Sequence, residues 1–219
     1  MRYVLSIFLA FSISMSINAQ FLEKKENLKS YDGFFDFHYN ENEDEIYLEV
    51  DSLNTAFLYT QFLTTGVGSN DIGLDRGQLG NTKILEFRKA GNKLLLVEPN
   101  QNYRAITSNQ AEKNSVKEAF AESVIFGFEI KETKESTYII DLTPFLMQDA
   151  HGVSEKLKKG KFGSYSLDKS KSALSLDRTK AFPENVEFEA LLTFSGKPTG
   201  RTVNSVVPDA SNLTVKQHH

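Results

Sequence analysis

A period-two alternation of apolar and polar residues recurs along this chain, and it constrains the fold more than any other feature. Successive side chains of a β-strand point to opposite faces, so this period is typical of strands buried on one face only. Antiparallel sheets with one solvated face have this pattern. The chain is therefore expected to be mainly β (α+β), with antiparallel, sandwich-like sheets and one or two short helices. The alternating stretches are 35–39, 45–50, 124–130, 138–142 and 186–194.

Two stretches predict β-hairpins. In KILEFRKAGNKLLLVEP (83–99), Gly91 and Asn92 lie between two strand-like runs. Residues of these types favour tight reversals of the chain. In YSLDKSKSALSL (165–176), a polar segment separates two further runs and predicts a second hairpin.

Helix signals are few. Ser115, followed three residues later by Glu118, resembles a capping box and predicts a short helix that begins there. Thr143 followed by Pro144 has the form of a helix start, and Gly160 has the form of a helix stop. These signals fit one or two short helices packed on the sheets.

The first nineteen residues have the features of a cleaved export signal. Arg2 precedes an apolar run at 3–13, and small or polar residues follow as far as Ala19. No segment has the roughly 20 consecutive apolar residues of a membrane span. The expected organisation is a signal peptide (1–19), a polar lead-in (20–30) and one β-rich module (31–219). The expected location is the periplasm or the exterior of a Gram-negative bacterium.

The amino-acid composition argues against several classes of site and partner. The chain contains no cysteine, which excludes disulfides and thiolate metal ligands. Removal of Arg2 with the signal peptide lowers the 25 Lys and Arg residues to 24, against 29 Asp and Glu residues. KLKKGK (156–161) is the only basic cluster in the sequence. This balance argues against a nucleic-acid partner.

The stretch TTGVGSNDIGLDRGQLG (64–80) contains five glycines between two apolar runs. It lacks the lysine and hydroxyl residue of a phosphate loop, and Asp71 stands where a dinucleotide fingerprint needs a third glycine. Asn70, Asp71 and Asp75 offer at most three side-chain ligands where calcium takes six or more oxygens. Two interpretations remain for this stretch, and they are compatible with each other: a long turn that uses positive φ, and a binding surface.

The histidines do not predict a zinc site in this chain. His38, His151, His218 and His219 lack the spacing that places two imidazoles on one helix face beside a glutamate. His151 is instead expected to be a capping residue or a hydrogen-bonding loop residue. The adjacent His218 and His219 are expected on opposite faces of a strand.

No covalent or acid–base machinery is predicted either. No serine lies in a G-x-S-x-G elbow, and there is no cysteine nucleophile. Glu187 and Glu189 share one face of an alternating strand. The alternation predicts that this is the solvent face, where the two carboxylates would keep the protein soluble.

Six stretches of the chain carry a family likeness: GFFDFHYNENEDEIYLEV, GVGSNDIGLDRGQLG, AFAESVIFGFEI, FLMQDAHGV, SYSLDKSKSALSLDRTKAFPENVEFEALLTFSG and LTVKQHH. Together they resemble the N-terminal region of large secreted bacterial zinc-dependent metalloproteases, over residues 31–219. The resemblance implies a non-catalytic module of unknown function followed by a metzincin-like domain with an H-E-x-x-H motif.

The resemblance also implies where activity would reside. The chain ends before any H-E-x-x-H motif, so zinc and peptidase activity are expected in a missing C-terminal domain, and no cofactor is expected here. The expected function is that of an accessory module of a secreted metallopeptidase. Its partner would be its own protease domain, and a peptide or protein substrate would be reached through that domain. The alternative is a free-standing secreted β-sandwich module that binds a peptide or glycan.

Within this likeness, the glycine-rich loop is the expected contact with the protease domain. Asp71, Asp75 and Arg76 are the candidates for polar contacts across that interface. The glycines at 68, 73 and 77 are expected to be needed for the backbone conformation. The candidate residues of the loop are Gly66, Gly68, Asn70, Asp71, Gly73, Asp75, Arg76 and Gly77.

Overall fold

The computed structural model describes residues 21–219, so the expected signal peptide (1–19) lies outside the described residues. In this range the chain forms thirteen strands and three short α-helices. All the strand pairs are antiparallel. The mainly β, antiparallel fold expected from the alternation is confirmed.

The larger sheet has eight strands in the order β1-β2-β3-β9-β8-β7-β6-β4. The expected hairpin at 83–99 is present as β6 and β7, with Gly91 at φ 58° in its turn. β1 begins in the expected polar lead-in (20–30) and forms one edge of the sheet, and β4 forms the other. The strands are β1 (Leu28–Tyr31), β2 (Phe37–Asn40), β3 (Glu45–Val50), β4 (Phe57–Tyr59), β6 (Lys83–Ala90), β7 (Lys93–Glu98), β8 (Ser123–Lys134) and β9 (Thr137–Asp141).

The smaller sheet has the order β10-β12-β13-β5, and β11 also pairs with β12. β12 is long enough to pair with β10 near its end and with β11 near its start. The expected hairpin at 165–176 is therefore wrong, because β10 and β11 lie end to end along β12 and do not pair with each other. The strands are β5 (Phe62–Thr65), β10 (Gly163–Leu167), β11 (Ala173–Phe182), β12 (Asn185–Pro198) and β13 (Asn212–His218).

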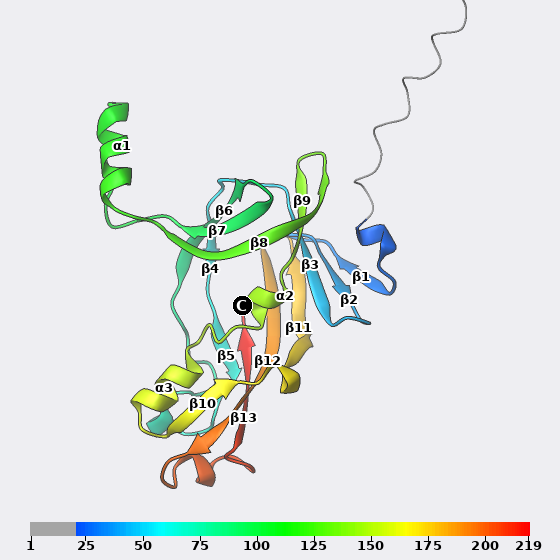
Figure 1. Ribbon diagram of the computed structural model, residues 1–219, viewed down its shortest axis with the longest axis vertical. Coiled ribbons are helices and arrows are strands. Elements are labelled where there is room, and N and C mark those ends of the chain that lie inside the picture. The colour runs from blue at the N-terminus through cyan, green and yellow to red at the C-terminus, as the bar shows by residue number, and fades with distance from the viewer. Residues whose placement is uncertain (1–20) are drawn as a thin grey trace, which may run out of the picture.

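The two sheets meet where β11 and β12 reach under the larger sheet, which arches over them in Figure 1. Phe188 of β12 belongs to the core of the larger sheet, together with Phe37, Phe87 and Phe128. Farther along β12, Leu192 belongs to the separate core of the smaller sheet. One long strand thus contributes to both cores, which gives the sandwich-like arrangement.

The helices depart from their sequence signals in one place. α1 (Gln110–Ala119) begins five residues before Ser115, because the side chain of Asn109 caps it by accepting a hydrogen bond from the backbone N–H of Ala111. The expected capping box at Ser115 is therefore wrong. α1 has no buried residue and stands away from the sheets in Figure 1.

The other two helices lie close to the sheets. α2 (Thr143–Leu146) has Pro144 in its first turn, and Phe145 and Leu146 are buried. α3 (Val153–Lys159) ends at Gly160, as the sequence predicts, and buries Val153 and Leu157 in the core of the smaller sheet. None of the helices in residues 21–219 is long and apolar enough to cross a membrane.

Candidate functional site

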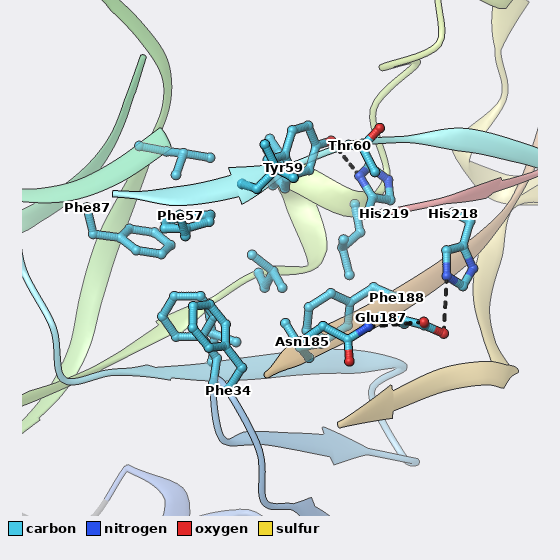
Figure 2. Close-up of a pocket in the computed structure, with 18 of the residues that line it drawn as sticks. Phe34, Phe57, Tyr59, Thr60, Phe87, Asn185, Glu187, Phe188, His218 and His219 are labelled. Atoms are coloured by element: carbon cyan, nitrogen blue, oxygen red, sulfur yellow. Dashed lines mark hydrogen bonds and ion pairs between the residues drawn. The ribbon is translucent and has the colours of Figure 1, made fainter. Parts of the chain in front are cut away.

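An aromatic cavity of about 420 Å³ lies where the two sheets meet, and Figure 2 shows the side chains around it. Its volume falls within the range of about 300–1,000 Å³ that is usual for small-molecule pockets. The walls come from the β1–β2 loop, β3, β4, β5, β6, β7, α2, the β11–β12 turn, the start of β12 and the end of β13. The aromatic residues that line it are Phe34, Phe35, Phe57, Tyr59, Phe62, Phe87, Phe145 and Phe188.

The aromatic wall is a continuous set of ring contacts. The ring of Phe35 meets Phe57 edge to face at 5.4 Å between centroids and Phe87 at 5.8 Å. Phe57 stacks on Phe87 at 5.6 Å. Ring pairs at these separations stabilise each other by about 0.5–1.5 kcal/mol beyond the area that they bury. The wall is thus held in shape by its own contacts.

His219 fixes the wall on the side of β13. The Tyr59 hydroxyl lies 2.7 Å from Nδ1 of His219, and the backbone of His219 exchanges two hydrogen bonds with that of Phe188. Burial lowers the pKa of His219 to about 3. Burial also raises the pKa of the Tyr59 hydroxyl. Both groups are therefore neutral near pH 7 and add no charge to the cavity.

The polar part of the lining contains Glu184, Asn185, Glu187 and His218. Oε2 of Glu187 lies 3.5 Å from Nε2 of His218, and Asn185 donates to Oε1 of Glu187 at 3.2 Å. Figure 2 shows both contacts of Glu187 as dashed lines. The side chain of Glu187 is 37% exposed, so its carboxylate is accessible from solvent.

The neighbouring glutamate, Glu189, does not lie where the alternation predicts. Glu189 was expected to be solubilising on the solvent face with Glu187, but its side chain is fully buried. It accepts hydrogen bonds from Thr64 (2.5 Å) and Ser175 (2.6 Å), and Nζ of Lys216 lies 3.4 Å away. Burial alone would raise the pKa of Glu189, but these donors hold it below its ordinary value. The expectation failed because side chains of other strands in the same sheet surround Glu189 on that face: Thr64 of β5, Ser175 of β11 and Lys216 of β13.

The glycine-rich loop lies elsewhere, and none of its eight candidate residues lines the cavity. Gly68, Gly73 and Gly77 all take positive φ, of 81°, 69° and 81°, the conformation that glycine adopts without steric cost. A Cβ at Gly66 would overlap the carbonyl oxygen of Leu74. Asn70, Asp71 and Arg76 are exposed, Asp75 is half-buried, and residues 21–219 show no ion pair between Asp75 and Arg76.

The body of the loop packs into the core of the smaller sheet. Val67, Ile72 and Leu74 are buried there. The loop also returns alongside β5, because the N–H of Gly77 donates to the carbonyl of Leu63 at 2.6 Å. The long turn is therefore an ordered part of the core that leaves its polar residues at the surface.

His151 is a hydrogen-bonding loop residue that joins Gln61, just before β5, to Lys156 of α3. Its Nδ1 lies 2.8 Å from Oε1 of Gln61, and its Nε2 lies 2.8 Å from Nζ of Lys156 and 3.3 Å from Gln78. Burial, assisted by the charge of Lys156, lowers the pKa of His151 to about 4. The imidazole is neutral near pH 7, so Nε2 accepts a hydrogen bond from Lys156.

Metal binding finds no support in the arrangement of ligands. Across residues 21–219 the structure contains no group of three or more His, Asp or Glu side chains that could hold a metal ion. His38 pairs with Glu49 and Ser30, far from the three other histidines in sequence. The cavity lining offers apolar enclosure together with the carboxylates of Glu184 and Glu187.

A comparison with protein-family models gives one match. Residues 77–219, about two thirds of the chain, match the family described as a domain of unknown function, DUF5117. The chain belongs to the DUF5117 family. Its description states no activity. No curated protein and no solved structure matches the chain.

The DUF5117 match covers only part of the structural unit. It begins at Gly77 and includes β6 to β13, whereas β1 to β5 precede it. Yet β5 pairs with β13, and β4 pairs with β6. Five of the eight aromatic residues that line the cavity come from this preceding region: Phe34, Phe35, Phe57, Tyr59 and Phe62. The cavity therefore needs both parts of the chain.

No motif of the sequence predicted this cavity. Val186 and Phe188 were recognised as strand positions, and His218 and His219 were considered as metal ligands. Inward-facing phenylalanines on alternating strands normally indicate a filled core. A possible signal was the high phenylalanine content, 17 residues with no tryptophan, but it does not say which rings leave a gap.

Proposed function

We propose that this chain is a non-catalytic binding module of a secreted zinc-dependent metallopeptidase, and that its aromatic cavity receives an apolar group of a protein partner. The cavity is the observation that carries the binding role. Zinc and catalysis belong to a separate C-terminal domain in this proposal. That part rests on the resemblance of residues 31–219 to the N-terminal region of such enzymes.

The character of the lining supports an apolar occupant. The rings of Phe35, Phe57 and Phe87 are in mutual contact, so a ligand meets a surface that is already formed. A preformed site loses little conformational entropy on binding. Burial of an apolar group contributes about 25 cal/mol per Å² of surface removed from water.

The enclosed aromatic wall favours a protein group over a sugar. Phe35 and Phe87 are buried, and the polar side chains lie on one part of the lining. A sugar carries hydroxyl groups around its ring, and each would need a hydrogen-bond partner in the cavity. An apolar side chain has no such requirement.

The glycine-rich loop is proposed as a second contact with the peptidase domain. Asp71, Asp75 and Arg76 are at least partly exposed, while the body of the loop is anchored in the core. A rigid loop with exposed charges suits an interdomain surface, because its charges need little ordering on contact. Binding at the cavity does not depend on this second proposal.

Fluorescence titration with tryptophol, a neutral indole alcohol, tests the binding role. The chain contains no tryptophan, so indole emission reports only the probe when it is excited beyond the tyrosine absorption band. We expect saturable binding to residues 20–219. Val186→Phe, which adds a ring within the cavity lining, should weaken binding at least tenfold.

The matched control is Val124→Phe, because Val124 is 56% exposed on β8 and lies outside the cavity lining. This variant should bind tryptophol as the wild type does. Absence of saturable binding, or equal loss in both variants, would contradict the binding role.

The link to a metallopeptidase is tested separately by the gene. A reading frame that continues past codon 219 into an H-E-x-x-H motif supports it. A stop codon there, with a stable secreted product, would support the free-standing module instead.

A further inference from the structure

The cavity lining contains acidic side chains but no basic ones in residues 21–219. Two carboxylates, Glu184 and Glu187, belong to the lining, and no lysine or arginine lines the cavity in the described part of the chain. Lys180 lies opposite Glu187 in the strand register, but it is not part of the lining. Within residues 21–219, no lysine or arginine forms an ion pair with Glu187, and the titratable side chain in contact with it is His218, at 3.5 Å.

The histidines of the lining do not offset this charge near pH 7. Burial lowers the pKa of His218, against the opposing effect of Glu187 and Glu189. His219 is neutral, as described above. The cavity thus combines aromatic walls with uncompensated negative charge at its accessible part.

We propose that the cavity selects an apolar group that carries a positive charge, such as the side chain of a lysine or arginine presented by a protein partner. This inference rests on the proposed binding function and specifies its ligand class. The aliphatic stem of either side chain would lie among Phe57, Phe87 and Phe188, and its cationic end would face Glu187.

Two physical effects give this preference. An aromatic face attracts a cation within about 6 Å of its centre, because the ring carries negative charge density on its face. A carboxylate that is only partly exposed attracts a cation more strongly than it would in bulk water. An anion of the same shape would meet repulsion from Glu187 and would lose its hydration shell without replacement.

Three indole probes of similar shape separate these effects. Tryptamine is cationic, tryptophol is neutral, and indole-3-acetate is anionic. We expect tryptamine to bind about fivefold more tightly than tryptophol, and indole-3-acetate to bind more weakly than both. Added salt should reduce the advantage of tryptamine, because Glu187 is partly exposed to screening.

Glu187→Gln provides the decisive variant, since it keeps the shape of the side chain and removes its charge. In this variant tryptamine and tryptophol should bind within about twofold of each other. Glu118→Gln, on the protruding helix α1, is the matched control and should leave the full preference intact.

The outcomes distinguish this inference from the proposed function. Equal binding of all three probes, or a preference unchanged in Glu187→Gln, overturns the charge selectivity and leaves apolar binding standing. Binding of none of the probes overturns both.

Discussion

The two cores of this molecule are built from the same kind of alternating strand, yet one is closed and the other encloses a cavity. The core of the smaller sheet is mostly aliphatic, and Leu63, Leu192 and Leu213 are completely buried in it. The core of the larger sheet is rich in aromatic rings and adjoins the cavity of about 420 Å³.

The difference follows from side-chain shape. Aliphatic side chains interdigitate and fill a core to the density of an organic crystal. Planar rings that meet edge to face hold fixed separations, here 5.0 Å between Phe37 and Phe188 and 5.4 Å between Phe35 and Phe57. The aliphatic core is therefore expected to contribute more to stability, and the aromatic core adjoins the space proposed for binding.

The largest expected effect is a truncation in the closed core. Leu192→Ala should lower the free energy of unfolding by about 2–5 kcal/mol, because it leaves a void among buried neighbours. Phe34→Ala, at a cavity residue that is 45% exposed, should cost less than about 1 kcal/mol. Chemical denaturation of both variants measures the two costs. Equal costs would mean that the cores do not differ in this way.

A smaller effect is expected at the glycines that fit the loop into the closed core. Gly66→Ala should cost about 2 kcal/mol, because the new Cβ overlaps the backbone carbonyl of Leu74. Gly73→Ala has open space around it but a φ of 69°, so it should cost about 1 kcal/mol. Thermal unfolding of the two variants checks this order, and the reverse order would refute the steric argument.

The stability of the protein should depend on pH through two buried histidines, one beside each core. The pKa values of His151 and His219 are lowered to about 4 and about 3 in the folded state. The unfolded chain, with histidine pKa values near 6.5, binds more protons below that pH. Stability is therefore complete above about pH 6.5 and falls as the pH drops toward 4, by about 1 kcal/mol or more.

Substitution of one histidine measures how much that residue contributes to the dependence of stability on pH. His151→Asn should be less stable than the wild type at pH 7, because its contacts with Gln61 and Lys156 are lost. Its stability should also change less between pH 7 and pH 5. Denaturation midpoints at the two pH values give the comparison, and an unchanged slope would assign the pH dependence to other groups.

The smallest effects are expected at the surface of the loop. Asp75→Ala and Arg76→Ala should each change the stability of the isolated module by less than about 0.5 kcal/mol, the usual range for surface substitutions. If these residues contact a peptidase domain, the same changes should weaken domain association in a longer protein. A strong destabilisation by Asp75→Ala in the isolated module would instead make Asp75 an internal support of the loop.

Alternation predicted the strands because side-chain direction alternates in every strand, whatever its partners. It could not predict pairing. The polar segment between β10 and β11 has the composition of a turn, but β12 is long enough to pair with both strands on one side. For the same reason, the face of β12 that carries Glu189 could not be recognised as covered from the sequence of β12 alone.

The candidate site was less accessible to sequence reasoning. Clusters of polar residues and glycines can be recognised in a sequence, and the glycine-rich loop does use the predicted positive φ. The cavity, by contrast, is made by residues from Phe34 to His219 that only the tertiary structure brings together. A phenylalanine that lines a cavity and one that fills a core have the same sequence signature.

Methyl NMR spectroscopy during a titration with tryptamine tests the central claim most directly, because it observes both cores in one sample. We predict shifts at the methyl groups of Leu48, Leu96, Leu146 and Val186, which line the cavity. The methyl groups of Leu63, Leu192 and Leu213 in the closed core should stay unchanged. Shifts that are absent at the cavity, or equally large in both cores, would contradict the assignment of binding to the aromatic core.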